Sequence, residues 1–264
     1  MKQEREQKLI SRLSAVQEMS LGDAMALLDI SESTARRMFA KLESDGYAIR
    51  VHGGIKCLSR AMTLYSFEHG SRKNMEQKTA IARRACELLE DGDVIYCDSG
   101  TTIQCFCAEL SYHVKQRGLG VRIYTNSLAN LERLAPHMSV TLIGGEYREN
   151  RKDFCGYIAE QALSGLYFTK CFVGADGCAR GREFTTTDFE CARMNELAIR
   201  NSEKSVMLVD SSKFGVFSHV SYVSLESLST VITDTGAPES VLEEMRRSAE
   251  VIAVAPQPDG NERR

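Results

Sequence analysis

Residues 94–110 read VIYCDSGTTIQCFCAEL, and this stretch decides the fold class of the larger part of the chain. Apolar residues come first, small polar residues and a glycine follow, and a helical pattern comes next, as in a buried strand that turns directly into a helix. Gly100 permits close backbone approach, Thr101 and Thr102 offer hydroxyls, and the N–H groups that begin the helix favour an anion. The stretch therefore predicts a phosphate site at the end of a strand.

The alternation of helix and strand continues on both sides of this stretch. Residues 76–93 are predicted to be a helix, and further helical segments lie between the extended segments VRIYTNS, SVTLIGG, KCFVGAD and SVMLVD. The extended segment TVITD follows SVMLVD without a predicted helix, and one more helix separates it from VIAVA. Short aliphatic strands that alternate with helices imply a mainly parallel sheet with helices on both faces. We expect an α/β domain over residues 76–264.

Several of these strands end in small polar residues, which would share one edge of a parallel sheet. The residues predicted to line a pocket there are Asp98, Gly100, Thr101, Thr102, Thr125, Asn126, Ser127, Gly144, Gly145, Asp176, Gly177 and Lys213. Each motif alone is ordinary turn chemistry. Their repetition, together with the cation of Lys213, favours an anion pocket.

Three amphipathic helices are predicted before residue 47. The apolar spacing indicates one helix at 4–17 and a shorter one after Leu21, and Ser31 is a candidate N-cap for a third that Gly46 ends. The third helix carries apolar residues on one face and basic residues on another. Two helices joined by a short turn, the second of them basic, are typical of a helix-turn-helix that enters the major groove of DNA.

A short hairpin, RVHGGIK, follows the third helix and resembles the wing of a winged helix. The predicted DNA contacts are Ser33, Thr34, Arg36, Arg37 and Lys41 on the helix, and Arg50, His52 and Lys56 on the wing. Arginine suits both phosphate oxygens and the paired acceptors of guanine, whereas the wing residues would position the protein on the backbone. The alternative is an oligomerisation or docking module with a solvated basic face.

Charge is distributed unevenly along the 264 residues, whose net charge is −3. Between positions 33 and 60, six basic residues stand against two acidic ones, which indicates a polyanionic partner for that part alone. Residues 58–75 show no clear period. We therefore expect a winged helix-turn-helix domain at 1–57, a linker at 58–75 and an effector domain at 76–264.

Composition narrows the function classes further. No apolar run approaches the ~20 residues of a membrane-spanning helix, and the N-terminus lacks the apolar stretch of a secretory signal, so a cytoplasmic location is expected. The nine cysteines include no CxxC pair, which favours reduced, buried thiols over a disulfide framework or a zinc site. We expect no cofactor, metal or membrane partner.

Eight motifs in a fixed order carry a resemblance over about residues 4 to 255. They are SESTARRMFAKLESDG, RVHGG, EQKTAIA, DSGTT, TNSL, GGEYR, FVGADG and DSSKFG. In combination they resemble the DeoR-type family of bacterial sugar-metabolism transcription regulators. The resemblance implies an N-terminal DNA-binding domain and a C-terminal effector domain with a fold like ribose-5-phosphate isomerase. It also implies that Glu190 is an acidic residue beside the ligand pocket.

Three hypotheses of function follow. Members of the resembled family typically repress catabolic operons and are relieved by a phosphorylated sugar, so the first is a repressor of that kind, at least a dimer because paired half-sites strengthen binding to operator DNA. The second is a sugar-phosphate isomerase-like enzyme with a helical extension, in which Asp98, Asp176 or Glu190 would be the base. The third is an oligomerisation domain with a vestigial pocket. We expect the regulator and no catalytic residue.

Overall fold

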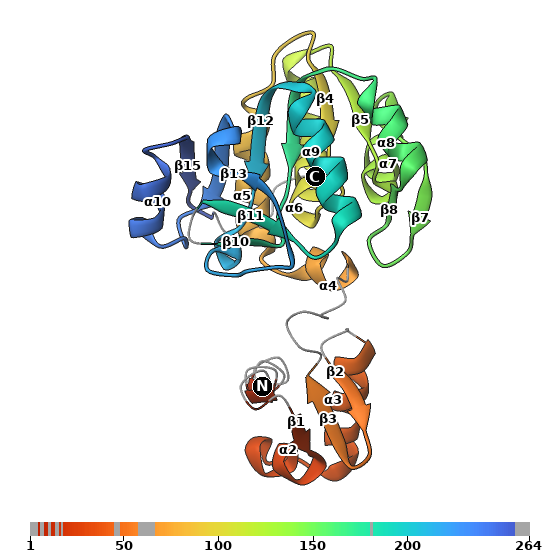
Figure 1. Ribbon diagram of the computed structural model, residues 1–264, viewed down its shortest axis with the longest axis vertical. Helices are drawn as coiled ribbons and strands as arrows, with labels where there is room; N and C mark the ends of the chain where they lie inside the picture. Colours follow the sequence, from red (N-terminus) through yellow and green to blue (C-terminus); the bar gives the residue numbers. More distant parts are fainter. Residues whose placement is uncertain are drawn as a thin grey trace. The chain divides into compact units, whose positions relative to one another are not determined.

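The computed structural model describes residues 18–44, 48–57, 67–179 and 182–256, with scattered residues before position 18. The chain divides into two compact units, Met1–His69 and Gly70–Arg264 (Figure 1). Most of the predicted helix at 4–17, the predicted helix stop Gly46 and residues 58–66 of the predicted linker lie outside the described residues.

The first unit contains the predicted pair of helices and the wing. Its described elements are β1 (Glu18–Ser20), α2 (Leu21–Leu28), α3 (Glu32–Ser44), β2 (Ala48–Val51) and β3 (Gly54–Cys57). Ser20 begins α2 with a capping box to Asp23, and Asp29 ends that helix in the left-handed conformation at φ 50°. Ala24, Phe39 and Leu42 pack in one apolar core.

The strands of the first unit form an antiparallel sheet in the order β1-β3-β2. Gly53 makes the tip of the hairpin at φ +78°. A Cβ atom at Gly54 would lie 2.5 Å from the carbonyl oxygen of Met19 on β1, so close pairing with β1 requires glycine there. The sequence pattern did not predict β1, because three residues are too few to show a period.

The second unit is built on a seven-stranded sheet in which all neighbouring strands are parallel. Its order is β15-β14-β12-β9-β4-β5-β6. The strands are β4 (Val94–Cys97), β5 (Arg122–Thr125), β6 (Val140–Leu142), β9 (Phe168–Val173), β12 (Ser202–Leu208), β14 (Thr230–Asp234) and β15 (Glu250–Val254). The predicted α/β class with a parallel sheet is confirmed.

Helices cover both faces of this sheet (Figure 1). They are α5 (Met75–Cys86), α6 (Thr101–Arg117), α7 (Leu128–Leu134), α8 (Tyr157–Ser164), α9 (Phe189–Arg200) and α10 (Glu239–Met245). Side chains of β4 alternate between the two cores: Ile95 and Cys97 pack with α5, α6 and α7, whereas Tyr96 packs with α8 and α9. The two layers of core explain why the strands read as continuous apolar runs.

The chain reverses direction across the sheet between β4 and β9. From β4 it runs outward through β5 to β6, and from the neighbouring β9 it runs the other way through β12 and β14 to β15. In open parallel sheets such a reversal leaves a crevice outside the carboxyl ends of the two central strands, where ligands bind. The loops after β4 and β9 contain Asp98 and Asp176, respectively.

Several elements differ from the predictions or were not predicted. A hairpin of β7 (Glu146–Arg148) and β8 (Asp153–Cys155) precedes α8, and β10 (Gly177–Ala179), β11 (Glu183–Thr186) and β13 (Val220–Ser224) form a small antiparallel sheet. The described end of the predicted linker is helical, as α4 (Phe67–Arg72). Helix α5 ends at Cys86 and not near residue 93, because the N–H groups of residues 87–89 bond to carbonyls three residues back and tighten the last turn.

Candidate DNA-binding surface and effector site

Helix α3 presents Ser33, Arg37 and Lys41 along one exposed stripe, since these residues are four positions apart. Thr34 is half-buried, and its hydroxyl accepts a hydrogen bond from Arg37 at 3.4 Å. The predicted helix contacts thus face solvent, apart from Thr34, whose side chain orients its neighbour. This is the arrangement that a recognition helix requires.

Arg36 and Arg50 lie together in a groove between α3 and the wing, which Glu43, Gly53 and Gly54 also line. The guanidinium of Arg36 is 2.8 Å from Glu32, and that of Arg50 is 2.6 Å from Glu43. Both pairs are solvent-exposed, so breaking them costs little and the two arginines remain available to phosphate groups.

The wing places its cations on two faces. Arg50 pairs in register with Ile55, whose side chain is buried, and Lys56 pairs with Ile49, which is exposed. Because successive strand residues face opposite sides, Arg50 lies toward α3 and Lys56 lies on the outer face. His52 is exposed at the turn. The structure therefore brings Arg50 to Arg36 and keeps Lys56 apart from both.

Asp98 connects the two central loops of the second unit. Its Oδ2 accepts a hydrogen bond from the backbone N–H of Gly174 at 3.2 Å, which ties the loop after β4 to the loop after β9. The side chain is buried, and burial raises the pKa of the Asp98 carboxyl to about 6. The predicted residues of these two loops thus meet at the crevice where the chain reverses.

The N-terminus of α6 lies at this crevice with a buried cation beside it. Gly100 precedes the helix, and among the described residues no side chain caps its first N–H groups. Lys78 on α5 is 3% exposed, and its Nζ donates to Thr101 Oγ1 at 3.0 Å. Burial lowers the pKa of the Lys78 ammonium. The unpaired N–H groups, the hydroxyls and the ammonium all favour an anion at this point.

Lys213 lies at the same edge of the sheet, in the loop that follows β12. It ends the short 3-10 helix η2 (Ser211–Lys213), which follows β12. Burial is the main reason that the pKa of the Lys78 ammonium is lowered, and the positive charge of Lys213 lowers it further. The carboxylate of Asp210 begins η2, and its buried Oδ2 has no hydrogen-bond partner among the described residues.

Thr125, Asn126 and Ser127 are buried and bond within the protein. Thr125 Oγ1 donates to the Cys97 carbonyl at 2.7 Å, Asn126 Oδ1 accepts from Tyr96 at 3.0 Å, and Ser127 caps α7. Their side chains hold neighbouring loops together. Any contact with a ligand would come from their backbone.

Gly144 and Gly145 follow β6 at the same edge of the sheet. A Cβ atom at Gly145 would lie 2.5 Å from the carbonyl oxygen of Cys155, so this position requires glycine for packing, whereas nothing lies within 4 Å of a Cβ at Gly144. The pattern predicted both as pocket residues, and the structure gives Gly145 a packing role in addition.

Arg148, on the unpredicted hairpin, is bound by several carboxylates. Its guanidinium donates to Asp153 at 2.9 and 2.8 Å, to Asp188 at 3.0 Å and to Glu190 at 3.0 Å. Burial would lower the pKa of Arg148, but the hydrogen bonds to Asp153 raise it above its ordinary value. Asp153 also accepts from Ser99 at 2.8 Å, which joins this cluster to the loop after β4.

Arg151 makes a second link between the hairpin and the loop after β9. It is 2.6 Å from Asp188 and 3.4 Å from Asp176, and it donates to Thr187. Asp176 also accepts from the Thr187 hydroxyl at 3.0 Å, and Gly177 next to it packs against the Val216 carbonyl. The predicted Asp176 and Glu190 therefore hold arginines at the rim of the crevice.

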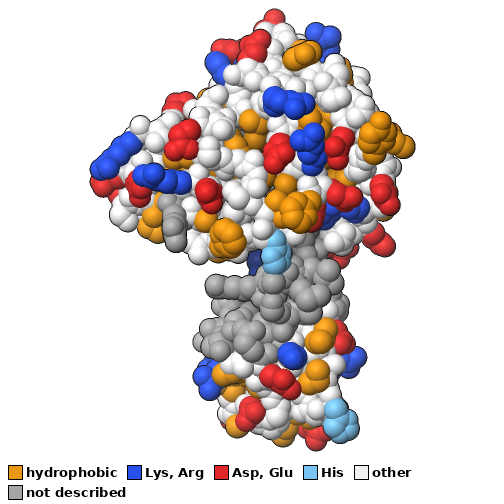
Figure 2. Space-filling view, in the orientation of Figure 1, with side chains coloured by type: hydrophobic (Ala, Val, Ile, Leu, Met, Phe, Trp, Pro, Cys, Tyr) orange, Lys and Arg blue, Asp and Glu red, His pale blue; other side chains and the backbone are white. Residues whose placement is uncertain are grey.

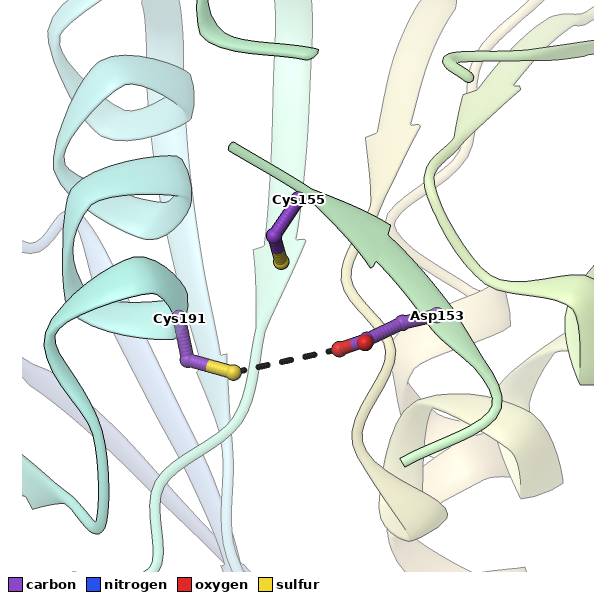
Figure 3. Close-up of side chains that lie close together, drawn as sticks. All are labelled: Asp153, Cys155 and Cys191. Atoms are coloured by element: carbon purple, nitrogen blue, oxygen red, sulfur yellow. Dashed lines mark hydrogen bonds between the residues drawn. The ribbon is translucent and has the colours of Figure 1, made fainter. Parts of the chain in front are cut away.

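Asp153, Cys155 and Cys191 form the one described cluster with metal-ligand chemistry, their ligand atoms lying within 4.8 Å of one another (Figure 3). The Arg148 guanidinium already pairs with Asp153 and is 3.0 Å from the Cys191 sulfur. Because this positive charge satisfies the carboxylate, the cluster is better suited to bind the Arg148 guanidinium than a metal ion. The eight cysteines from Cys86 to Cys191, whose side chains the structure describes, are buried free thiols.

Three cations of this site were not predicted as site residues: Lys78, Arg148 and Arg151. Lys78 had a usable signal, because it falls on the apolar stripe of its helix with Ala82 and Ala85, where a charge needs a reason. Arg148 ends the motif GGEYR, but the pattern of apolar residues did not single it out, and Arg151 lies between two strands too short to show a period.

Two family models match the chain. The DeoR-like helix-turn-helix domain matches residues 5–61, and the DeoR C terminal sensor domain matches residues 73–235. The chain belongs to the DeoR family. Similar proteins include the lactose phosphotransferase system repressor of Lactococcus lactis subsp. lactis, which is 33% identical over 95% of this chain and 98% of its own length. The repressor of the same name from Streptococcus mutans serotype c is 28% identical over 95% and 99%.

Solved structures similar to this DeoR-family chain include ribose 5-phosphate isomerase A from Methanocaldococcus jannaschii. It is 21% identical, with a TM-score of 0.42 over 54% of this chain and 55% of its own. The enzyme of the same name from Neisseria gonorrhoeae is 19% identical, with a TM-score of 0.40 over 56% of each chain. These scores carry no conclusion about a reaction.

The surface of the second unit differs from that of the recognition helix. On the face drawn in Figure 2, its described acidic and basic side chains are interspersed and do not gather by sign.

No helix among the described residues is long and apolar enough to cross a membrane.

Proposed function

We propose that this DeoR-family protein is a transcriptional repressor of a carbohydrate-utilisation operon whose binding to operator DNA is modulated by a phosphorylated sugar. The observation that carries the effector site is the uncapped N-terminus of α6 with Lys78 and Lys213 beside it, at the reversal point of the sheet. The names of the lactose phosphotransferase system repressors support both the repressor role and the sugar chemistry.

The proposed ligand sits with its phosphate on residues 100–102, where the helix N-terminus, the Thr101 and Thr102 hydroxyls and the two lysines supply donors. Its hydroxyls face the rim, where Asp176, Glu190 and the arginines that they hold are available. The hydrogen bonds of Thr125, Asn126 and Ser127 hold in place the loops that line the crevice.

DNA binding is proposed to use α3 for base contacts and the wing for phosphate contacts. One recognition helix reads only a half-site, so we propose a homo-oligomer, at least a dimer, on paired half-sites in cytoplasmic DNA. Sedimentation of the purified chain at micromolar concentration tests this: a monomer that binds its operator as a monomer would contradict it.

The first experiment recovers sheared genomic DNA bound by the purified protein at near-physiological, stated salt and sequences it, because phosphate contacts make affinity depend strongly on salt. We expect enrichment of a few intergenic fragments next to carbohydrate genes. Enrichment of no fragment, with and without a pool of sugar phosphates, would contradict the proposal.

A second experiment tests the effector site with Lys213→Ala. The response of operator binding to galactose 6-phosphate and ribose 5-phosphate should weaken at least about 10-fold, since one charge-assisted contact is lost. Lys204→Ala is the matched control, because Lys204 is exposed near the start of β12, the strand that leads to Lys213. An unaltered response to every sugar phosphate in Lys213→Ala would rule out the pocket assignment.

The isomerase alternative is tested with the same sugar phosphates. Of the three candidate bases, Asp176 is hydrogen-bonded to two threonines and paired with Arg151, and Glu190 is paired with Arg148. We propose that these carboxylates hold arginines and do not abstract protons. Measurable interconversion of ketose and aldose phosphates by the wild type, lost in Asp98→Asn, would favour the enzyme.

A further inference from the structure

The segment that joins the two units is fastened directly to the effector edge. Helix α4 spans the boundary between the units, with Phe67 in the first and Gly70 in the second. The Gly70 carbonyl accepts a hydrogen bond from Lys78 Nζ at 2.6 Å, and the same Nζ donates to Thr101 Oγ1. One buried ammonium therefore bridges the connecting helix and the anion-binding turn.

Gly70 also packs against that turn. A Cβ atom at this position would lie 3.2 Å from Thr101 Cγ2, closer than side chains ordinarily approach, so the backbone of α4 rests on the Thr101 side chain. A ligand that moves Thr101 or Lys78 must therefore change the packing or the hydrogen bonding of Gly70.

A second fastening lies one turn further along the chain. Asn74, between α4 and α5, adopts the left-handed conformation at φ 52°. Its Nδ2 donates to Asp210 Oδ1 at 2.8 Å and to Ser212 Oγ at 3.1 Å, next to Lys213. Both lysines that face the anion site are thus one contact away from the segment at 70–74.

We propose that these contacts form a latch through which an anion at residues 100–102 acts on the DNA-binding unit. This inference rests on the proposed function. When the site is empty, Lys78 holds the Gly70 carbonyl and Asn74 holds the loop that carries Lys213. A phosphate draws both ammonium groups toward itself, because a charge-assisted hydrogen bond is stronger than one to a neutral carbonyl. The Gly70 carbonyl then keeps only the hydrogen bond from the Lys73 N–H at 3.2 Å, and α4 is released from the anion site.

The step needs no large movement. Lys78 shifts its Nζ from a carbonyl to the ligand, and the orphaned Asp210 Oδ2 offers Lys213 or Asn74 an alternative partner. Coupling between two binding sites is typically about 5–150-fold in affinity, which a change of two or three hydrogen bonds can supply.

The substitution Asn74→Gly tests the latch without changing a residue proposed to contact the anion. Glycine adopts the left-handed backbone without steric strain but removes both bonds to the η2 loop, and Asn74 is not among the residues proposed to touch the ligand. Glu76→Ala is the matched control, because Glu76 is exposed in the first turn of α5.

Hydrogen exchange of the full-length protein measures release of α4. Saturating galactose 6-phosphate or ribose 5-phosphate should protect the amides of residues 101–103 and speed exchange at 70–73 on the order of 5-fold, the low end of allosteric coupling. Asn74→Gly should show the fast exchange without ligand, and Glu76→Ala should behave as the wild type.

Two failures are distinguishable. If a sugar phosphate protects residues 101–103 while exchange at 70–73 is unchanged or slower, the latch is wrong and the effector site stands. If neither sugar phosphate nor inorganic phosphate protects residues 101–103, the effector site fails and the latch with it. Operator affinity gives the second readout: the ratio with and without ligand should fall in Asn74→Gly to less than about a third of the wild-type ratio, and an equal ratio overturns the latch.

Discussion

Arg36 in the first unit and Arg148 in the second both pair with carboxylates, yet the Arg36 side chain is 66% exposed and that of Arg148 is 16% exposed. The difference follows from the two anions proposed for the two units. A DNA backbone is long and must be met at the surface by side chains that exchange one partner for another at little cost. A small phosphorylated ligand is enclosed, so its site needs cations whose positions are fixed in advance by buried carboxylates.

The comparison extends to the lysines. Lys41 and Lys56 are exposed on α3 and β3, whereas Lys78 is buried on α5 and contacts Thr101 directly. The lysines compared in the first unit are exposed to solvent, whereas Lys78 in the second unit is buried and forms part of the internal hydrogen-bond network. Substitutions should therefore change DNA affinity in one unit and folding stability in the other.

The largest expected effect is on stability, from Arg148→Ala. Asp153 is 0% exposed and would lose its ion pair, and a buried charge without its partner destabilises a protein by about 3–5 kcal/mol. Urea denaturation followed by far-UV circular dichroism measures the loss in the second unit. Arg36→Ala is the control in the first unit, where an exposed pair is worth under about 1 kcal/mol. If the two substitutions lowered the free energy of unfolding equally, the buried ion pair of the second unit would contribute no more to stability than the exposed pair of the first.

The next effect concerns the pH dependence of stability through Asp98. Burial raises the pKa of this carboxyl to about 6 from its ordinary value of 3.8, so its contribution to stability is present below about pH 4 and is lost as pH rises through 6. At 1.36 kcal/mol per pKa unit the loss is about 3 kcal/mol. Asp98→Asn removes it, and the stability of the variant relative to the wild type should rise by about 2 kcal/mol between pH 4.5 and 7.5, because the rest of the loss falls below pH 4.5.

The control for this prediction is internal, because hydrogen bonds lost in Asp98→Asn shift the difference equally at every pH. Urea midpoints at four pH values give the slope. A difference that stays flat from pH 4.5 to 7.5 would mean that the carboxyl titrates normally in the folded protein.

A smaller effect is expected on operator affinity from Arg37→Ala. A bidentate contact from arginine to a base is worth about 1–3 kcal/mol, so affinity should fall about 5- to 150-fold while the urea midpoint stays unchanged. Arg84→Ala makes the same change of charge on the exposed side of α5 and serves as the control. Fluorescence anisotropy with the recovered operator measures both. A normal affinity in Arg37→Ala would place the recognition surface elsewhere.

The smallest expected effect is on the salt dependence of DNA binding, and it tests which face of the wing contacts phosphate groups. If Lys56 contacts one phosphate, Lys56→Ala should reduce the slope of log K against log salt by about 0.9 and leave sequence preference unchanged. Ile49, its cross-strand neighbour, provides a control as Ile49→Thr, which keeps the charge of the face. A slope identical to the wild type would assign the phosphate contacts of the wing to Arg50 and its side of the hairpin.

The elements that the sequence predicted are those with a clear apolar pattern. The parallel strands were predicted because they read as short continuous apolar runs, and the helices because apolar residues recur at every third to fourth position. The β7–β8 hairpin and the β10-β11-β13 sheet were not predicted, because strands such as EYR, DFC and EFTT lack the run of apolar residues that marks the strands of the parallel sheet. Arg148 and Arg151 went unpredicted with them.

The sequence by itself determined the class of each unit and the edge where the strand-end residues gather, since periodicity and strand direction are local properties. Only the tertiary structure decided which side chains face that edge. Thr125 and Asn126 bond inward, Lys78 arrives from a helix that precedes the first strand of the sheet, and Arg148 comes from a hairpin. The physical reason is that burying a charge is favourable only where partners from distant parts of the chain converge, and that convergence is set by packing.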